Sequence, residues 1–198
     1  MNNSDHIYSN LDLKKLLIPI IVEQLLSCLM GTVDTMMVSN VGSAAISAVS
    51  LVDSINVLVI QALSALAAGG AILCSQYLGS HNEKSANHAA RQVLLVMAVL
   101  STALSLLCLI FRVPMLHFIF GKVEADVMAN SQAYFLFTLL SFPFIGLYDA
   151  GASIMRAQND SRRPMIISVI SNFLNIGGNA ILIFGLNMGA VSYTHLTL

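Results

Sequence analysis

Residues 16–38 read LLIPIIVEQLLSCLMGTVDTMMV, a mostly aliphatic run of 23 residues. A helix of this length spans about 35 Å, enough to cross the hydrocarbon core of a bilayer. The run nevertheless contains Pro19 and two acids, Glu23 and Asp34, which share one helical face about 16 Å apart. Taken singly, each acid is compatible with a helix-end or packed structural group. Because a carboxylate in hydrocarbon is costly unless it faces protein or water, we expect this helix to line a polar cavity.

The composition is typical of a membrane protein with several spans. The chain is 57% hydrophobic and 10% charged, with a mean hydropathy of +0.79. Soluble domains carry about 25% charged residues. The net charge of −1 and the lack of a basic run argue against nucleic acid as a partner. Residues 1–12 are polar and do not form a cleavable signal peptide, so we expect the first apolar run to be retained behind a short cytoplasmic lead.

Five apolar stretches follow one another, and they predict an all-α integral membrane protein with five transmembrane helices. The expected spans are about 16–38, 46–77, 92–111, 127–154 and 165–188. Residues 113–126 are expected to form a short amphipathic piece at the membrane interface. The last residues, VSYTHLTL at 191–198, continue neither an apolar pattern nor a recognisable loop. We interpret them as a non-native or truncated tail, so the fold assignment covers residues 13–190.

Two local features concern helix packing. The small-residue run ALAAGGA at 65–71 is typical of helices that approach each other closely in lipid. Pro19 and Pro143 interrupt backbone hydrogen bonding inside expected spans, which allows those helices to bend.

The basic residues predict the orientation. With a cytoplasmic N-terminus, the outer side of the membrane carries only Arg112 and Lys122. The cytoplasmic side then collects the other seven basic residues, namely Lys14, Lys15, Lys84, Arg91, Arg156, Arg162 and Arg163. This positive-inside bias predicts that the N-terminus and the polar loops at 78–91 and 156–164 are cytoplasmic.

Four acids are expected at membrane depth: Glu23, Asp34, Asp53 and Asp149. No Lys or Arg lies deep in an expected span, so we expect these acids to have no cationic side chain as a partner. Such a carboxylate takes up a proton or holds a cation. A site whose occupancy changes between two conformations is what a cation-coupled transporter requires.

The fifth expected span carries one polar stripe at helical spacing, formed by Ser168, Asn172, Asn175 and Asn179. A stripe of this kind is either a set of interhelical hydrogen bonds or the wall of a cavity. Its asparagines can supply neutral oxygens beside a cation site.

Four motifs in order resemble the MATE family of multidrug and toxic compound extrusion transporters. They are Pro19 followed by VDTMMVS at 33–39, QYLG at 76–79, MRAQNDSRRPM at 155–165 and NFLNIGGNAILIFG at 172–185. The resemblance covers about residues 12–190. It implies a twelve-helix protein with two six-helix lobes, of which this chain is most of the N-terminal lobe without the sixth helix and the second lobe.

The resemblance also implies site residues. The family's first-helix bend and coupling carboxylate match Pro19 and Asp34, and its fifth-helix asparagine matches Asn175. This chain has Asn179 where many prokaryotic members have an aspartate, and Asp149 where those members often have an asparagine. We therefore expect Asp34 and Asp149 to share one coupling ion, with the two asparagines as neutral partners. The departure leaves open whether that ion is H⁺ or Na⁺, including Na⁺ at Asp34.

The resulting hypothesis is a cation-coupled antiporter in the cytoplasmic membrane, with no cofactor beyond H⁺ or Na⁺. It would export drugs or other small organic, often cationic, compounds. Cavity or gating roles are expected for Pro19, Glu23, Asp53 and Asn172. A lipid-linked-saccharide flippase is an alternative, but it would be expected to show more cationic residues in its cavity. An integral-membrane enzyme or a purely structural subunit is a further alternative; the sequence has no HExxH metal motif, and the buried acids argue against a structural subunit.

Overall fold

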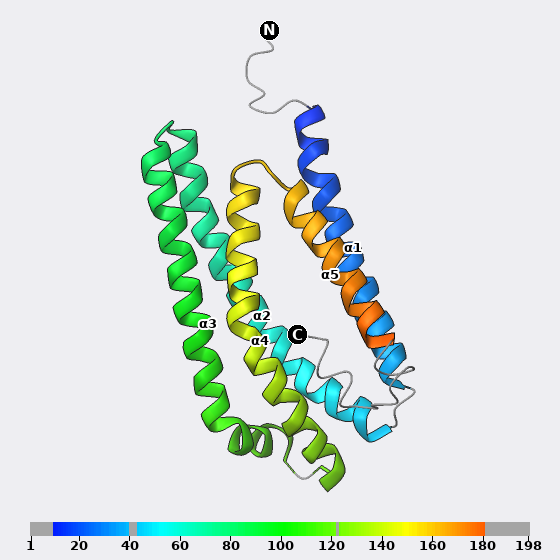
Figure 1. Cartoon of the computed structure of the whole chain (residues 1–198). Coiled ribbons are helices and arrows are strands. Elements are labelled where there is room, and N and C mark those ends of the chain that lie inside the picture. The colour runs from blue at the N-terminus through cyan, green and yellow to red at the C-terminus, as the bar shows by residue number, and fades with distance from the viewer. Residues whose placement is uncertain (1–9, 40–42, 122, 181–198) are drawn as a thin grey trace.

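The computed structural model describes residues 10–39, 43–121 and 123–180, and every element in these ranges is an α-helix. The helices are α1 (Asn10–Ser39), α2 (Ser43–Gly79), α3 (Glu83–Phe120), α4 (Ala125–Ala157) and α5 (Arg162–Ala180). Successive helices run in opposite directions along one bundle (Figure 1). The predicted all-α class is confirmed, and four of these helices, α1 to α4, are long and apolar enough to cross a membrane.

The first four predicted spans are shorter than their helices, because residues that flank each span are helical as well. The fifth predicted span is described only as far as Ala180. Its remaining part, residues 181–188, and the tail at 191–198 lie outside the described residues.

The helices fall into two groups. Helices α2, α3 and α4 pack against one another, while α5 packs along α1 (Figure 1). The core of the first group contains Val52 and Leu63 of α2, Met97 of α3, and Phe135 and Leu139 of α4. Helix α4 is the most buried of the four apolar helices and α1 is the least buried. α4 therefore lies at the centre of the described structure, and its side chains can reach both groups.

Two glycines allow helices to approach closely. A Cβ atom added to Gly70 of α2 would lie 2.5 Å from Cγ2 of Val93 in α3. A Cβ atom added to Gly146 of α4 would lie 2.7 Å from Cβ of Ser101 in α3. The close approach expected for the small-residue run at 65–71 is therefore confirmed at Gly70, and Gly146 provides a second contact of the same kind.

We expect Gly70→Ala to destabilise the full-length protein that carries this sequence by about 1–3 kcal/mol, because the new methyl group overlaps Val93. Adding Val93→Ala should restore most of the loss by removing the two methyl groups in the way. Gly69→Ala is the matched control, because no atom lies within 4 Å of its added Cβ. Thermal unfolding of the purified wild-type protein and of the three variants measures these effects. Equal melting temperatures for the Gly69→Ala and Gly70→Ala variants would contradict the packing.

Residues 113–126, expected to form a short amphipathic piece at the membrane interface, do not form an element of their own but are divided between the end of α3 and the start of α4. Residues 113–120 continue α3, with Pro114 inside the helix, and the chain turns at Gly121, whose φ is +62°. The amphipathic pattern does exist, since Leu116 is fully buried whereas Phe118 is 90% exposed. The packing of Leu116 and Phe120 against the core holds the helix together beyond the proline.

Candidate functional site

Three of the four acids expected at membrane depth are joined through α4. Glu23 of α1 and Asp53 of α2 each accept a hydrogen bond from an α4 tyrosine, and Asp149 belongs to α4 itself. The fourth, Asp34, lies in α1, but its side chain is outside the described part of the structure. Helix α4 is therefore the element that organises the site.

Glu23 is buried and paired with a cation. Glu23 as a whole residue is 6% exposed, and Nη2 of Arg156 lies 2.8 Å from both of its carboxylate oxygens, Oε1 and Oε2. The hydroxyl of Tyr148 donates to Oε1 at 3.1 Å. The expectation that no Lys or Arg pairs with the membrane-depth acids is thus wrong for Glu23. Arg156 belongs to the last turn of α4 rather than to the loop, and its long side chain reaches into the bundle.

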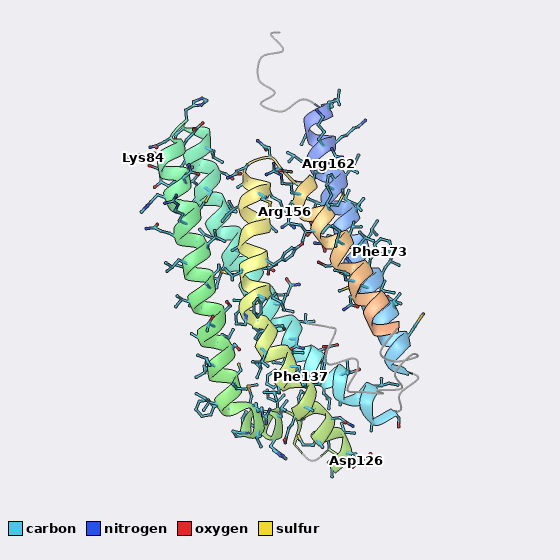
Figure 2. All side chains as sticks on the ribbon, viewed as in Figure 1. Lys84, Asp126, Phe137, Arg156, Arg162 and Phe173 are labelled. Atoms are coloured by element: carbon cyan, nitrogen blue, oxygen red, sulfur yellow. The ribbon has the colours of Figure 1, made fainter. Side chains whose placement is uncertain are left out.

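Asp149 lies beside this ion pair. Its Oδ2 accepts a hydrogen bond of 2.5 Å from the hydroxyl of Ser64 in α2, and both Glu23 and Arg156 act on it electrostatically. We call Glu23, Ser64, Tyr148, Asp149 and Arg156 the α1–α4 carboxylate cluster. Figure 2 shows Arg156 near the upper end of α4, on the side of the α1–α5 pair.

The charges in the α1–α4 carboxylate cluster do not balance. Its single guanidinium forms an ion pair with Glu23, while Asp149 receives its hydrogen bond from a neutral hydroxyl. Among the described residues Asp149 forms no ion pair. With both carboxylates ionised, the cluster carries one excess negative charge within the length of the apolar helices. A proton or a small cation would neutralise that charge.

Asp53 belongs to a different contact between α2 and α4. Its Oδ1 accepts hydrogen bonds from the hydroxyl of Tyr134 at 2.9 Å and from Nδ2 of Asn56 at 3.3 Å. Asn56 is itself buried, and its Oδ1 has no hydrogen-bond partner in the described structure. The hydrogen bond between Tyr134 and Asp53 ties α2 to α4 away from the α1–α4 carboxylate cluster.

The helix register groups Asp149 with Glu23 and not with Asp34. Asp34 is eleven residues beyond Glu23 on α1, about 16 Å further along the bundle. Asp149, in contrast, directly follows Tyr148, whose hydroxyl bonds to Glu23. Because the side chain of Asp34 lies outside the described part of the structure, the shared Asp34–Asp149 site expected from the sequence stays a prediction.

The first two residues of the polar stripe of α5 face the interior of the bundle. Ser168 and Asn172 are both buried, and Nδ2 of Asn172 donates to the Ser168 carbonyl at 2.8 Å. Oδ1 of Asn172 is also buried and has no partner in the described structure. Asn175 is half-buried, and the side chain of Asn179 lies outside the described part. Pro19, one turn before Glu23 on α1, is buried inside the helix.

Sequence reasoning missed Ser64, Tyr148 and Arg156 as members of the cluster. One signal was present: Asp149 and Arg156 are seven residues apart, which puts them on one face of a helix. The hydroxyl groups gave no comparable signal, because serine is common at contacts between membrane helices and tyrosine is common near membrane interfaces.

Comparison with known proteins agrees with this architecture. The family model MatE matches residues 19–181. The chain is 31% identical to the "Uncharacterized transporter YisQ" of Bacillus subtilis over 85% of this chain and 36% of the relative. It is 26% identical to the "Probable multidrug resistance protein NorM" of Thermotoga maritima over 88% of this chain and 37% of the relative. The chain thus spans a little over one third of the curated relatives it matches.

A solved structure shares the fold. The outward-facing conformation of a multidrug resistance MATE family transporter of the MOP superfamily superposes with a TM-score of 0.88. That match has 21% sequence identity and covers 94% of this chain and 41% of the other. The family match also sets aside the enzyme alternative. The long apolar helices and the match over residues 19–181 lead to one conclusion: the chain is a multi-pass membrane protein that belongs to the MATE family of transporters.

Proposed function

We propose that the protein is a cation-coupled exporter of small organic molecules. The observation that carries this proposal is the charge imbalance of the α1–α4 carboxylate cluster, in which two acids face one guanidinium. A site of this kind alternates between an empty state of net negative charge and a loaded, neutral state. Such a difference lets ion binding shift the populations of two conformations. Relatives named as probable multidrug resistance proteins support the same proposal.

Asp149 takes the role of the loaded group in the α1–α4 carboxylate cluster. Glu23 is already compensated by Arg156, so a proton or Na⁺ gains more at Asp149. Nε of Arg156 is buried and has no hydrogen-bond partner in the described structure. When Asp149 loses its ion, its carboxylate can accept a hydrogen bond from this Nε–H of Arg156. The release of the ion would then change the contact between α4 and α1, which is how loading is coupled to helix movement.

Asp34 is proposed as a second coupling carboxylate at a different level of the bundle, with Asn175 and Asn179 as its neutral partners. The resemblance to the family supports this role, and the register supports its separation from Asp149. Pro19, buried one turn before Glu23, is proposed as the point where α1 bends when the contact with α4 changes. Asp34 and Asp149 favour substrates that carry positive charge, because an organic cation can replace the coupling ion at either carboxylate.

A reconstitution experiment tests the proposed function. The full-length protein that carries this sequence is placed in liposomes, and a pH or Na⁺ gradient is imposed separately. Transport of a fluorescent organic cation should follow one of the two gradients and stop when an ionophore removes it. Transport that is unaffected by both gradients, or no transport of organic cations at all, would contradict the proposal.

We further propose that the N-terminus is cytoplasmic. Lys84, Arg156 and Arg162 lie toward one end of the bundle and Asp126 lies at the other (Figure 2). Positive charge gathers at the cytoplasmic ends of membrane helices. The end that holds the loops 80–82 and 158–161 is therefore assigned to the cytoplasm.

Accessibility to an impermeant thiol reagent checks this orientation in a background without the native cysteines. Ser80→Cys and Gln158→Cys are exposed reporters at the proposed cytoplasmic end, whereas Ser161 is only 2% exposed and is unsuitable. Both variants should stay unlabelled in intact cells and react after permeabilisation. Ala125→Cys, exposed at the opposite end, should react in intact cells and serves as the control. The reverse pattern would overturn the orientation.

A further inference from the structure

A shallow hollow lies at one end of the α2–α3 pair, away from the α1–α4 carboxylate cluster. Its volume is about 560 Å³. The residues that line it include Tyr77 of α2 and Lys84, Ser85, His88, Arg91 and Gln92 of α3. Figure 2 shows Lys84 at this end of the bundle, on the opposite side from Arg162.

The lining has positive charge and no acid. Lys84 and Arg91 are both exposed, and neither forms an ion pair within the described ranges. His88 lies between them and shares a hydrogen bond of 3.1 Å with Gln92. Lys84, His88 and Arg91 are spaced by four and three residues, so they occupy one face of α3 over about two turns. Three nitrogen-bearing side chains thus face the same volume without a carboxylate among them.

The same face of α3 becomes apolar immediately below the basic residues. Leu95, Val99 and Leu106 continue the spacing of Arg91, and they are 65%, 58% and 54% exposed. In a helix that crosses a membrane, exposed apolar side chains of this kind are available to contact lipid chains. The basic hollow therefore lies directly above a stripe that faces acyl chains.

We propose that this hollow binds the phosphate headgroup of an anionic phospholipid, whose acyl chains lie along the apolar stripe of α3. The order of charge and hydrophobicity along this one face matches the order of phosphate and hydrocarbon in a lipid. Lys84 and Arg91 supply the positive charge, and basic residues at the membrane surface attract anionic lipids. A soluble anion would match the hollow but would gain nothing from Leu95 and Val99, which is why a lipid fits better than free phosphate.

The test is a titration of the full-length protein in detergent with phosphatidylglycerol, read by native mass spectrometry and by the shift in melting temperature. Neutralising one basic residue near a membrane surface costs about fivefold in lipid affinity, so Lys84→Gln with Arg91→Gln should lower it roughly 25-fold. Arg112→Gln is the matched control, because it removes a basic residue near the other end of the same helix. Phosphatidylcholine should bind the wild-type protein weakly and without this dependence.

Three results would overturn the proposal. The first is phosphatidylglycerol binding that is equal in the double variant and in wild type. The second is displacement of the lipid by an equal concentration of inorganic phosphate, which would identify a site for a soluble anion. The third is a melting temperature of the wild-type protein that responds equally to phosphatidylglycerol and phosphatidylcholine, a measurement that stands even if the double variant fails to fold.

Discussion

Arg156→Gln should lower the free energy of unfolding of the full-length protein by about 3 kcal/mol, because it leaves the Glu23 carboxylate buried without a cation. The side chain of Glu23 is 8% exposed, so its carboxylate has little hydration of its own to offset the lost guanidinium. The remaining partner, the hydroxyl of Tyr148, donates a single neutral hydrogen bond. Urea or thermal unfolding of the purified protein, followed by circular dichroism, measures the loss.

Two further variants separate this effect from a general response to lost charge. Glu23→Gln combined with Arg156→Gln should recover much of the stability, since neither a carboxylate nor a guanidinium is then buried alone. Arg163→Gln removes an arginine from an exposed ion pair with Asp160 and should cost less than about 1 kcal/mol. If Arg156→Gln were as mild as Arg163→Gln, Glu23 would not depend on its partner and the ion pair would have no structural role.

The sequence predicts the helices well because membrane spans leave a strong signal. Length and hydropathy were enough to place α1 to α4, and one helical wheel was enough to align Ser168 with Asn172. The continuation of α3 through residues 113–120 was not predicted, and it has a physical cause. Pro114 is a helix breaker by local preference, but Leu116 and Phe120 beyond it pack against core residues that are distant in sequence, and this packing favours a continuous α3.

The candidate site was predicted in its acids but not in their partners. Glu23 and Asp149 could be chosen because a carboxylate inside an apolar run is rare and costly. Their partners depend on how helices pack: Arg156 is 133 positions from Glu23, and Ser64 is 85 positions from Asp149. A single sequence contains no information on such pairs. The pairing of Asp149 with Asp34 came from matching family positions and stays a prediction, because the side chain of Asp34 is not described.

The second large effect is expected for transport. Asp34→Asn should reduce gradient-driven efflux to the level of empty liposomes, because the substitution keeps the shape of the side chain and removes the charge that holds the coupling ion. Asp149→Asn should leave some efflux but with fewer ions moved per substrate molecule, since it removes one of the two proposed ion-binding carboxylates. Asp126→Asn, an exposed change on the first turn of the same helix α4, is the matched control and should behave as wild type.

One further variant distinguishes two separate loads from a single shared one. Adding Asn179→Asp to Asp149→Asn returns an acid to the helix where many prokaryotic members have it. With separate loads, this change should restore some efflux without restoring the Glu23–Arg156–Asp149 arrangement, so the ion count per substrate should recover while stability does not change. The readouts are the initial rate of fluorescent-cation efflux and the charge moved per substrate in proteoliposomes under an imposed pH or Na⁺ gradient. Wild-type coupling in the Asp34→Asn protein would remove Asp34 from the mechanism. Wild-type ion count in the Asp149→Asn protein would show that the excess charge of the α1–α4 carboxylate cluster is not used for coupling.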